Sequence, residues 1–184
     1  MKTIALIGPT GVGKTTVARL LAAQLGVPHV SLDNTRQQLL KETAFDAAHA
    51  DALKTENFES VIRYWERFGP HVVRRTLEMH SEGVFDFGAI HSVYDDPNNL
   101  ASVKQSLRSL DDVVLLLPSP DKARSLDFLI ARGREPGMSD ETIQMWRRII
   151  GRFIMHESNY QLCRRQVFVE DRRPDEVCAA ILTC

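Results

Sequence analysis

Gly8-Pro9-Thr10-Gly11-Val12-Gly13-Lys14-Thr15 follows the pattern G-x-x-x-x-G-K-S/T, and the residues on both sides fit that pattern. The preceding residues, Lys2 to Ile7, form a short apolar run of strand type. Apolar residues then recur at helical spacing, at Val17, Leu20, Leu21 and Leu25. Strand, glycine-rich turn and helix together predict a P-loop, the loop that holds the phosphates of a nucleoside triphosphate.

In a P-loop, backbone N–H groups and the positive end of the helix surround the phosphate chain. We therefore expect nucleotide contacts from eight residues: Gly8, Thr10, Gly11, Val12, Gly13, Lys14, Thr15 and Thr16. Lys14 would reach the β- and γ-phosphates, and the Thr15 hydroxyl would bind Mg²⁺. The chain is thus expected to use ATP or GTP together with magnesium.

Composition narrows the class of protein. A chain of 184 residues with 43% hydrophobic residues fits a single domain, which we place at residues 1–184. A net charge of −1 gives no footprint for nucleic acid or an anionic membrane, so neither is expected as a partner. No apolar run has the length of a membrane helix, the N-terminus leads directly into a strand, and the cysteines lack metal-ligand spacing. These features predict a cytoplasmic protein.

Strand patterns alternate with helical patterns along the chain. Four further strands are expected, at His29–Asp33, Gly83–Gly88, Val113–Leu117 and Gln166–Val169. A strong amphipathic helix is expected from Asp140 to about His156, with an apolar face of Ile143, Trp146, Ile149, Ile150 and Phe153. This alternation predicts an α/β protein of three layers, α/β/α, around a five-stranded parallel sheet.

The chain has no Asn-Lys-x-Asp segment of the kind with which GTPases read guanine, which favours ATP. Its small size, its early P-loop and the flexible, Arg-rich segment Arg132–Ser139 resemble P-loop kinases of the shikimate kinase and nucleoside monophosphate kinase branch. The resemblance covers nearly the whole chain in element order, with its specific motifs within residues 1–36. It implies the P-loop NTPase fold, a lid at about 132–140 and a small helical acceptor lobe at about 34–80.

The segment from Ser31 to Arg36 matches two families in different ways. Shikimate kinases carry Asp-x-Asp here, and the second Asp contacts the hydroxyl that is phosphorylated; Asp33 matches it, while Ser31 replaces the first. Monophosphate kinases carry Asp-x-x-Arg, with the Arg on the acceptor phosphate, and Asp33 and Arg36 match that too. A carboxylate at the end of a strand can orient an acceptor hydroxyl and take its proton. We expect this role for Asp33; the alternative is a helix N-cap.

Three residues around the third strand are further candidates. Asp86 would end that strand, which suits a Mg²⁺ ligand, and it matches an Asp at the same place in monophosphate kinases, although Asp-Phe-Gly-Ala-Ile stands here for Asp-Gly-Phe-Pro-Arg. Shikimate kinases have Gly-Gly-Gly nearby, of which Gly88 is kept, and Gly88 would let substrate approach the backbone. His91 in the following loop could touch the acceptor; its alternative is a solvated loop histidine.

The second half of the chain supplies arginines. Arg132 and Arg134 flank Gly133, and a lid at this place would put a guanidinium on the transferred phosphoryl group; a solvated loop is the alternative. Resemblance to shikimate kinases implies that Arg124 stacks on adenine, although a surface ion pair would also fit. Arg173 and Pro174 lie where the adenine-contacting loop of that family falls.

The acceptor is left open. Shikimate kinases typically read Arg-Asn-Pro-Leu-Tyr after the long helix, and that Arg holds the shikimate carboxylate; His156 stands at its place here and is our candidate for acceptor binding. We expect a shikimate-kinase-like, ATP- and Mg²⁺-dependent kinase that phosphorylates a hydroxyl of a small molecule, as a monomer or a small homo-oligomer; whether shikimate is that molecule is left open. A nucleoside monophosphate kinase and an ATP-dependent switch without a small acceptor are the alternatives.

Overall fold

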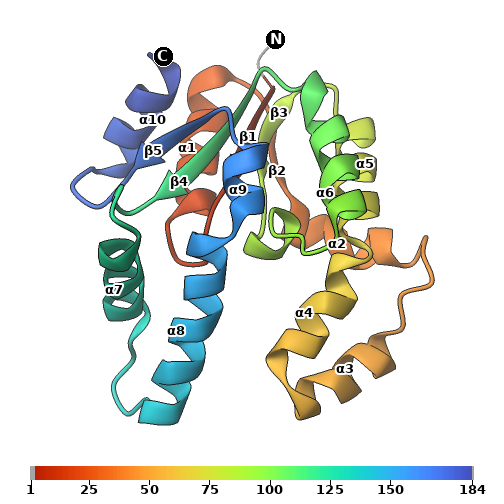
Figure 1. Cartoon of the computed structure of the whole chain (residues 1–184). Helices are drawn as coiled ribbons and strands as arrows, with labels where there is room; N and C mark the ends of the chain where they lie inside the picture. Colours follow the sequence, from red (N-terminus) through yellow and green to blue (C-terminus); the bar gives the residue numbers. More distant parts are fainter. Residues whose placement is uncertain (1–2, 184) are drawn as a thin grey trace.

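The structure is a computed structural model that describes residues 3–183. Five strands form one parallel sheet in the order β2-β3-β1-β4-β5 (Figure 1). They are β1 (Thr3–Ile7), β2 (His29–Ser31), β3 (Gly83–Asp86), β4 (Asp112–Leu117) and β5 (Arg165–Phe168). The predicted five-stranded parallel sheet is confirmed. Lys2, which we expect to begin the first strand, lies outside the described residues.

Helices connect the strands. They are α1 (Lys14–Leu25), α2 (Leu32–Leu40), α3 (Ala47–Glu56), α4 (Phe58–Glu66), α5 (Gly69–Met79), α6 (Pro97–Ser106), α7 (Lys122–Gly133), α8 (Asp140–Met155), α9 (Glu157–Leu162) and α10 (Pro174–Leu182). Two short 3₁₀ helices complete the set, η1 (Ala89–His91) and η2 (Leu107–Ser109). Within residues 3–183, each helix is too short or too polar to cross a membrane.

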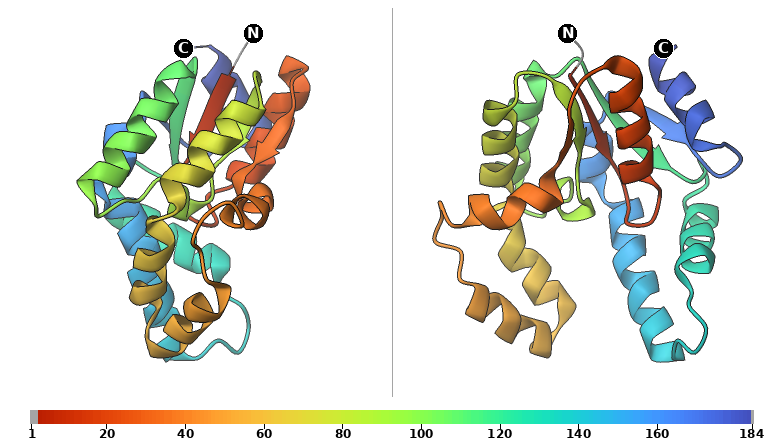
Figure 2. Two further views of the ribbon diagram at one scale, coloured as in Figure 1. Left: turned by 90° about the vertical axis from the view of Figure 1, so that its right-hand side faces the viewer. Right: turned by 180° about the vertical axis from the view of Figure 1, so that it is seen from behind.

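The sheet separates two parts of the core, because alternate residues of a strand face opposite sides. Ile4 and Leu6 of β1 pack with residues of α1 and α10, whereas Ala5 and Ile7 pack with residues of α5 and α6. In Figures 1 and 2, α1 and α10 accordingly cover one side of the sheet, and α5 and α6 cover the other. The expected three layers, α/β/α, are present.

Two predicted strand ends are wrong. The second strand ends at Ser31, because Ser31 is the N-cap of α2 and Leu32 already begins that helix. Asp33 therefore lies in the first turn of α2 and not in a strand. At that position the helix dipole favours a negative charge. The third strand ends at Asp86, which pairs with Leu6 of β1 and Ser31 of β2, so Gly88 lies in the loop before η1.

Two helical hairpins project beyond the carboxyl edge of the sheet. In one, α3 packs on α4, and in the other α7 packs on α8. Figure 1 shows both hairpins below the sheet, on the side where the loop after β1 turns into α1. Ligands of parallel α/β proteins bind at this edge, so the hairpins stand beside the place where a site is expected.

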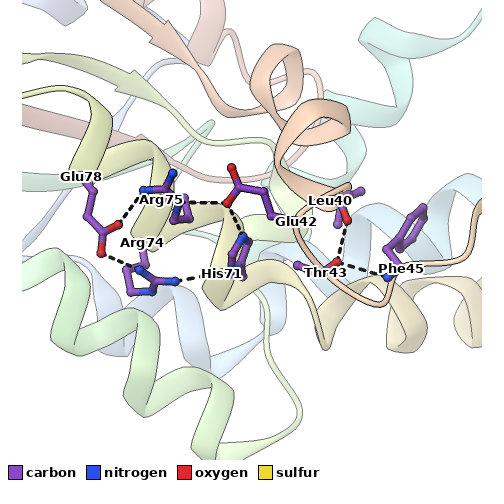
Figure 3. Close-up of polar contacts among 8 residues, drawn as sticks. All are labelled: Leu40, Glu42, Thr43, Phe45, His71, Arg74, Arg75 and Glu78. Atoms are coloured by element: carbon purple, nitrogen blue, oxygen red, sulfur yellow. Dashed lines mark hydrogen bonds and ion pairs between the residues drawn. The ribbon is translucent and has the colours of Figure 1, made fainter.

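A polar network fixes the end of α2 to α5 (Figure 3). Glu42, just after α2, accepts a 2.9 Å bond from Arg75 Nε, and its Oε2 lies 3.1 Å from His71 Nε2. Glu78 accepts bonds from Arg74 at 2.6 Å and Arg75 at 3.0 Å. These contacts hold α2, the helix that carries Asp33, against α5, which covers one face of the sheet.

Candidate active site

The glycines of the P-loop have backbone conformations that other residues rarely adopt. Gly8, Gly11 and Gly13 have φ angles of +140°, +82° and +103°. At Gly8 an added Cβ would also collide with the carbonyl oxygen of Leu116 in the neighbouring strand β4. The loop therefore lies tightly against the sheet, with its turns made possible by glycine.

The start of α1 is built to receive an anion. Its N-cap, Gly13, offers no side-chain hydrogen bond, and its first turn contains no acidic residue. The first N–H groups of a helix have no intrahelical acceptor, and they carry the positive end of the helix dipole. Because α1 begins directly after the glycine-rich loop, the free N–H groups of the loop and of the first helical turn lie together, as in a phosphate-binding site.

Lys14 is a buried cation in the same loop. Its side-chain nitrogen donates bonds of 2.9 Å to the carbonyl oxygens of Gly8 and Pro9. Burial lowers the pKa of Lys14 to about 8, although the carboxylates of Asp86 and Asp33 act in the opposite direction. An anionic phosphate beside this ammonium group would restore the charge stabilisation that burial removes.

Most of the predicted site residues line one cavity of about 470 Å³ at the carboxyl edge of the sheet. Its predicted lining residues are Thr10, Gly11, Gly13, Lys14, Thr15, Thr16, Asp33, Asp86, Gly88 and Arg132. Ala89, Leu129, Gly133, Trp146 and Ile150 complete it. The Val12 side chain instead packs in the core, so only its backbone is placed to meet a phosphate.

The cavity offers two groups that suit a magnesium ion. Thr15 and Asp86 both line it, and the described residues contain no group of three or more His, Cys, Asp or Glu side chains placed to hold a metal. Mg²⁺ is usually held by one or two protein ligands, with water and phosphate oxygens completing the shell, so this sparse set fits it. His29 Nε2 lies 3.6 Å from Asp86 Oδ2. Sequence reasoning missed His29, because only the pairing of β2 with β3 brings it there.

Asp33 projects into the cavity from the first turn of α2. Its Oδ1 lies 3.8 Å from Arg36 Nη1 and 3.8 Å from His91 Nδ1. A Cβ added to Gly88 would lie 2.7 Å from Asp33 Cγ. The space beside the Gly88 Cα is filled by the Asp33 carboxylate, but Gly88 still lines the cavity, so its contact with substrate stays a prediction.

His91 is buried, with 1% of its surface exposed. Both expectations for this side chain, a solvated ring and a direct contact with the acceptor, are therefore corrected. Its Nδ1 faces Asp33 and has no hydrogen-bond partner in the described part of the chain. Burial lowers the pKa of His91 to about 4, against the opposing effect of Asp33. A neutral imidazole therefore lies behind the Asp33 carboxylate at neutral pH.

The two lid arginines differ in position. Arg132, in the last turn of α7, lines the cavity, whereas Arg134 lies just after α7 in a small recess that also contains Trp146. The Trp146 ring lies over Gly133, where an added Cβ would approach it to 2.9 Å. The sequence predicts Trp146 only as part of the apolar face of α8; its contribution to the cavity follows from the packing of α8 on α7.

Two other predicted site residues have structural partners. His156 does not line the cavity: its Nε2 lies 3.0 Å from Asp95 Oδ1, and its Nδ1 accepts a bond from the Ser158 N–H as the N-cap of α9. The expected acceptor contact of His156 is corrected accordingly. Arg124 forms the alternative ion pair, at 2.7 Å to Glu170.

The predicted adenine loop follows Glu170. Arg173 is the N-cap of α10 and Pro174 is its first residue. Neither lines the 470 Å³ cavity, so their contact with adenine stays a prediction.

A second cavity, of about 330 Å³, adjoins the first and shares with it Thr10, Asp33, Ala89, Trp146 and Ile150. Its other lining residues are Arg36, Trp65, Ile90, Met145, Ile149 and Phe153. The guanidinium of Arg36 lies 4.8 Å from the centre of the Trp65 ring. Arg36 is thereby held beside Asp33, as the sequence predicts for an acceptor contact.

Comparison with known proteins concerns the fold that carries these residues. The family model described as "AAA domain" matches residues 4–148. The shikimate kinase from Acinetobacter baumannii in complex with shikimate has 18% identity and a TM-score of 0.62, over 99% of this chain and 91% of that chain. For the shikimate kinase from Bacteroides thetaiotaomicron the values are 21% and 0.61, over 98% and 95%. A gluconokinase from Sinorhizobium meliloti 1021 has 13% identity and a TM-score of 0.57, over 98% and 89%.

These likenesses concern the fold, and the predicted resemblance to the shikimate kinase branch is confirmed at that level. With the P-loop at the carboxyl edge of β1 and the family match over most of its length, the chain belongs to the AAA domain family and has the P-loop kinase fold seen in shikimate kinases.

Proposed function

We propose that the protein is an ATP- and Mg²⁺-dependent kinase that transfers the γ-phosphoryl group to a hydroxyl of a small molecule. One observation carries the proposal: Lys14, Thr15, Asp33, Asp86 and Arg132 line a single cavity at the carboxyl edge of the sheet. Solved structures of the same fold include shikimate kinases and a gluconokinase, which supports a small-molecule kinase over other uses of a P-loop.

In this proposal Asp33 takes the proton of the acceptor hydroxyl. The acceptor oxygen forms a bond to the γ-phosphorus, while the bond from that phosphorus to the bridging oxygen breaks and ADP leaves. Lys14 and Arg132 stabilise the charge on the transferred group. Thr15 and Asp86 would hold Mg²⁺, which neutralises phosphate charge when bound. Residues 132–140 would act as the lid and the helices within 34–80 as the acceptor lobe.

Removal of Lys14 and of Asp33 tests the assignment. Lys14→Met is expected to lower acceptor-dependent ADP release by about 100-fold or more, because the phosphates lose their cation. Asp33→Asn is expected to lower kcat by about 100-fold or more while the affinity for ATP is nearly unchanged. Asp127→Asn is the control, because Asp127 is also an exposed aspartate paired with an arginine, Arg147, but lies outside both cavities.

The assay measures ADP release with a panel of acceptors that includes shikimate, gluconate, nucleosides and nucleotides. Full phosphoryl transfer by Lys14→Met or Asp33→Asn would contradict the roles assigned to these residues. If no acceptor stimulates ADP release by the unmodified protein, the kinase proposal fails and an ATP-dependent switch is the better description.

A nucleoside monophosphate kinase is the second candidate, and the position of Arg36 favours it. Arg36 lines the 330 Å³ cavity beside Asp33, here called the acceptor cavity, and could hold an acceptor phosphate. Arg36→Gln would then raise the KM of a nucleoside monophosphate by about 10-fold or more, because a charge-assisted hydrogen bond is lost. An unchanged KM in this variant, or activity with alcohols alone, would exclude the second candidate.

A further inference from the structure

The cavity next to Asp33 is apolar over most of its lining. Trp65, Ile90, Met145, Trp146, Ile149, Ile150 and Phe153 contribute to it. The two tryptophans and Ile149 are only partly buried in the protein, so they present apolar surface to the cavity. A ligand that covers this surface would gain the free energy of removing it from water.

Polar side chains lie at one end of this cavity. Apart from the two indole N–H groups, they are Thr10, Asp33 and Arg36, and Thr10 and Asp33 also line the phosphate cavity. The hydroxyl of an acceptor therefore belongs at this end, and the rest of the molecule extends between α4 and α8. Within this cavity a polyol would find only Thr10, Asp33, Arg36 and the two indole N–H groups as side-chain partners.

The shape of the lining favours a flat ring. Trp65 comes from α4 and Trp146 from α8, and both line the same space of about 330 Å³. Aromatic rings pack well against indoles, in offset or edge-to-face arrangements. The Trp65 ring already has two cations over it, the guanidinium of Arg36 at 4.8 Å and the ammonium of Lys54 at 5.8 Å from its centre.

We propose that the acceptor is an alcohol that carries an aromatic ring, with its hydroxyl at Asp33 and its ring between Trp65 and Trp146. The proposal rests on the proposed kinase function and specifies its acceptor. It separates this protein from a kinase of gluconate- or shikimate-like polyols, for which the cavity has too few polar groups.

The chain itself supplies a direct measurement. It contains two tryptophans, and both line this cavity, although Trp146 also lines the 470 Å³ cavity. With a saturating ATP analogue already bound, a further change in tryptophan fluorescence reports on the 330 Å³ cavity. We would titrate the protein with 2-phenylethanol and with a nucleoside, and in parallel with gluconate, shikimate and glycerol, in the presence of a non-hydrolysable ATP analogue. A saturable change with the aromatic alcohols and none with the polyols is expected.

Two variants of one helix give a matched comparison. Met145 lines the cavity, whereas Met155, also on α8 and also exposed, does not. Met145→Gln is expected to raise the dissociation constant of the aromatic alcohol about 3- to 10-fold, since a polar amide replaces apolar contact surface. Met155→Gln is expected to leave it unchanged, and both variants should bind the ATP analogue as the unmodified protein does.

The results separate this proposal from the kinase proposal. ADP release that responds to polyols but not to aromatic alcohols would overturn the acceptor assignment and leave the kinase function standing. If no acceptor supports ADP release, the kinase function fails, and the fluorescence titration still decides whether the cavity binds an aromatic alcohol. Equal responses to both classes of alcohol, or equal effects of the two methionine variants, would overturn the acceptor assignment.

Discussion

At the scale of single residues, Asp33 lies near two buried titratable side chains, Lys14 and His91, whose charge states differ at neutral pH. Burial lowers the pKa of Lys14 to about 8 and that of His91 to about 4. At neutral pH, therefore, Lys14 is largely protonated and His91 is neutral. Asp33 thus lies near two cations, Lys14 and Arg36, and a neutral imidazole, and it is the group that would take the acceptor proton in the proposed reaction.

Gly88 gives the first prediction. Gly88→Ala would push the Asp33 carboxylate out of its place, because the new Cβ would come within 2.7 Å of Asp33 Cγ. We expect kcat to fall by about 100-fold, the effect of a small misplacement of a reacting group, with little change in ATP affinity. Gly151→Ala in α8 is the control, since its Cβ would make an ordinary contact of 3.9 Å with Leu126. Equal kcat values for both variants would refute the positioning of Asp33 by Gly88.

His91 gives a prediction about acid stability. Its pKa is about 4 in the folded protein and about 6.5 when unfolded, so the unfolded chain binds more protons between these pH values. Stability should therefore fall as the pH is lowered from 6.5 to 4, by up to about 3 kcal/mol from this residue. Asp33 opposes the shift, while Arg36 and Lys14 add to it. Denaturant unfolding of His91→Gln across this range should show a flatter slope than the unmodified protein, and the exposed His49→Gln should not.

The position of His91 shows what single-residue reasoning lacks. A histidine in a loop is ordinarily solvated, and nothing in Gly88–His91 marks the ring as buried. Its burial follows from η1 and the helices around it, which come from distant parts of the sequence. Asp33 and Lys14, in contrast, could be predicted because each belongs to a short motif whose geometry is local.

At the scale of elements, α2 carries Asp33 in its first turn, and the residue Glu42 just after its other end is held by ion pairs with α5. The pKa of Glu42 lies below its usual range because Arg75 donates a hydrogen bond to it, with a smaller effect of His71. This stabilising contribution is present at neutral pH and is lost as the pH falls through the acid range. The network of Figure 3 therefore resists movement of α2 relative to α5.

Glu42→Gln tests this network. We expect a small decrease in Tm, because the partners are exposed, and the decrease should shrink as the salt concentration rises. Glu82→Gln is the control, since within residues 3–183 Glu82 has no ion-pair partner. A difference from the unmodified protein that persists unchanged at high salt would show that the effect is not electrostatic.

Elements were predicted best where the pattern is long or the residues are buried on both sides. The amphipathic pattern of Asp140 to His156 gave α8 within one residue, and the apolar run at Val113 gave β4 within one residue. The predicted second strand begins at the right residue but is two residues too long, because three paired residues leave little pattern and Ser31 caps the next helix. The hairpin of α3 and α4 reaches the site through tertiary packing that no local pattern records.

At the scale of the whole molecule, nucleotide binding should appear as stability. A ligand present at 100 times its dissociation constant stabilises a protein by about 2.7 kcal/mol. ATP with Mg²⁺ should therefore raise the Tm of the unmodified protein and leave that of Lys14→Met nearly unchanged. Without nucleotide, Lys14→Met should be at least as stable as the unmodified protein at pH 7, because it removes a buried charge. A lower Tm of the ligand-free variant would mean that Lys14 mainly supports the fold.

The fold as a whole could be predicted because strands and helices alternate along the chain. The P-loop motif also shows that the ligand binds at the carboxyl edge of the sheet. The phosphate side of the site could be predicted with it, since Gly8 to Thr16 is continuous in sequence. The acceptor side could not, because Asp33, Trp65, Trp146 and Ile90 come from four separate segments. Whether Trp65 and Trp146 line one cavity depends on how the α3–α4 hairpin and the α7–α8 hairpin are oriented, and no local sequence pattern predicts that orientation.

The helix α8 forms a wall of both cavities: Trp146 and Ile150 line the two together. A change in the position of α8 when ATP binds is therefore also a change in the acceptor cavity. Thermodynamic linkage then makes the two affinities reciprocal, so that ATP alters acceptor binding by the same factor by which the acceptor alters ATP binding. In the proposed kinase, the shared wall of α8 would couple the two substrates, so that binding of each one changes the affinity for the other.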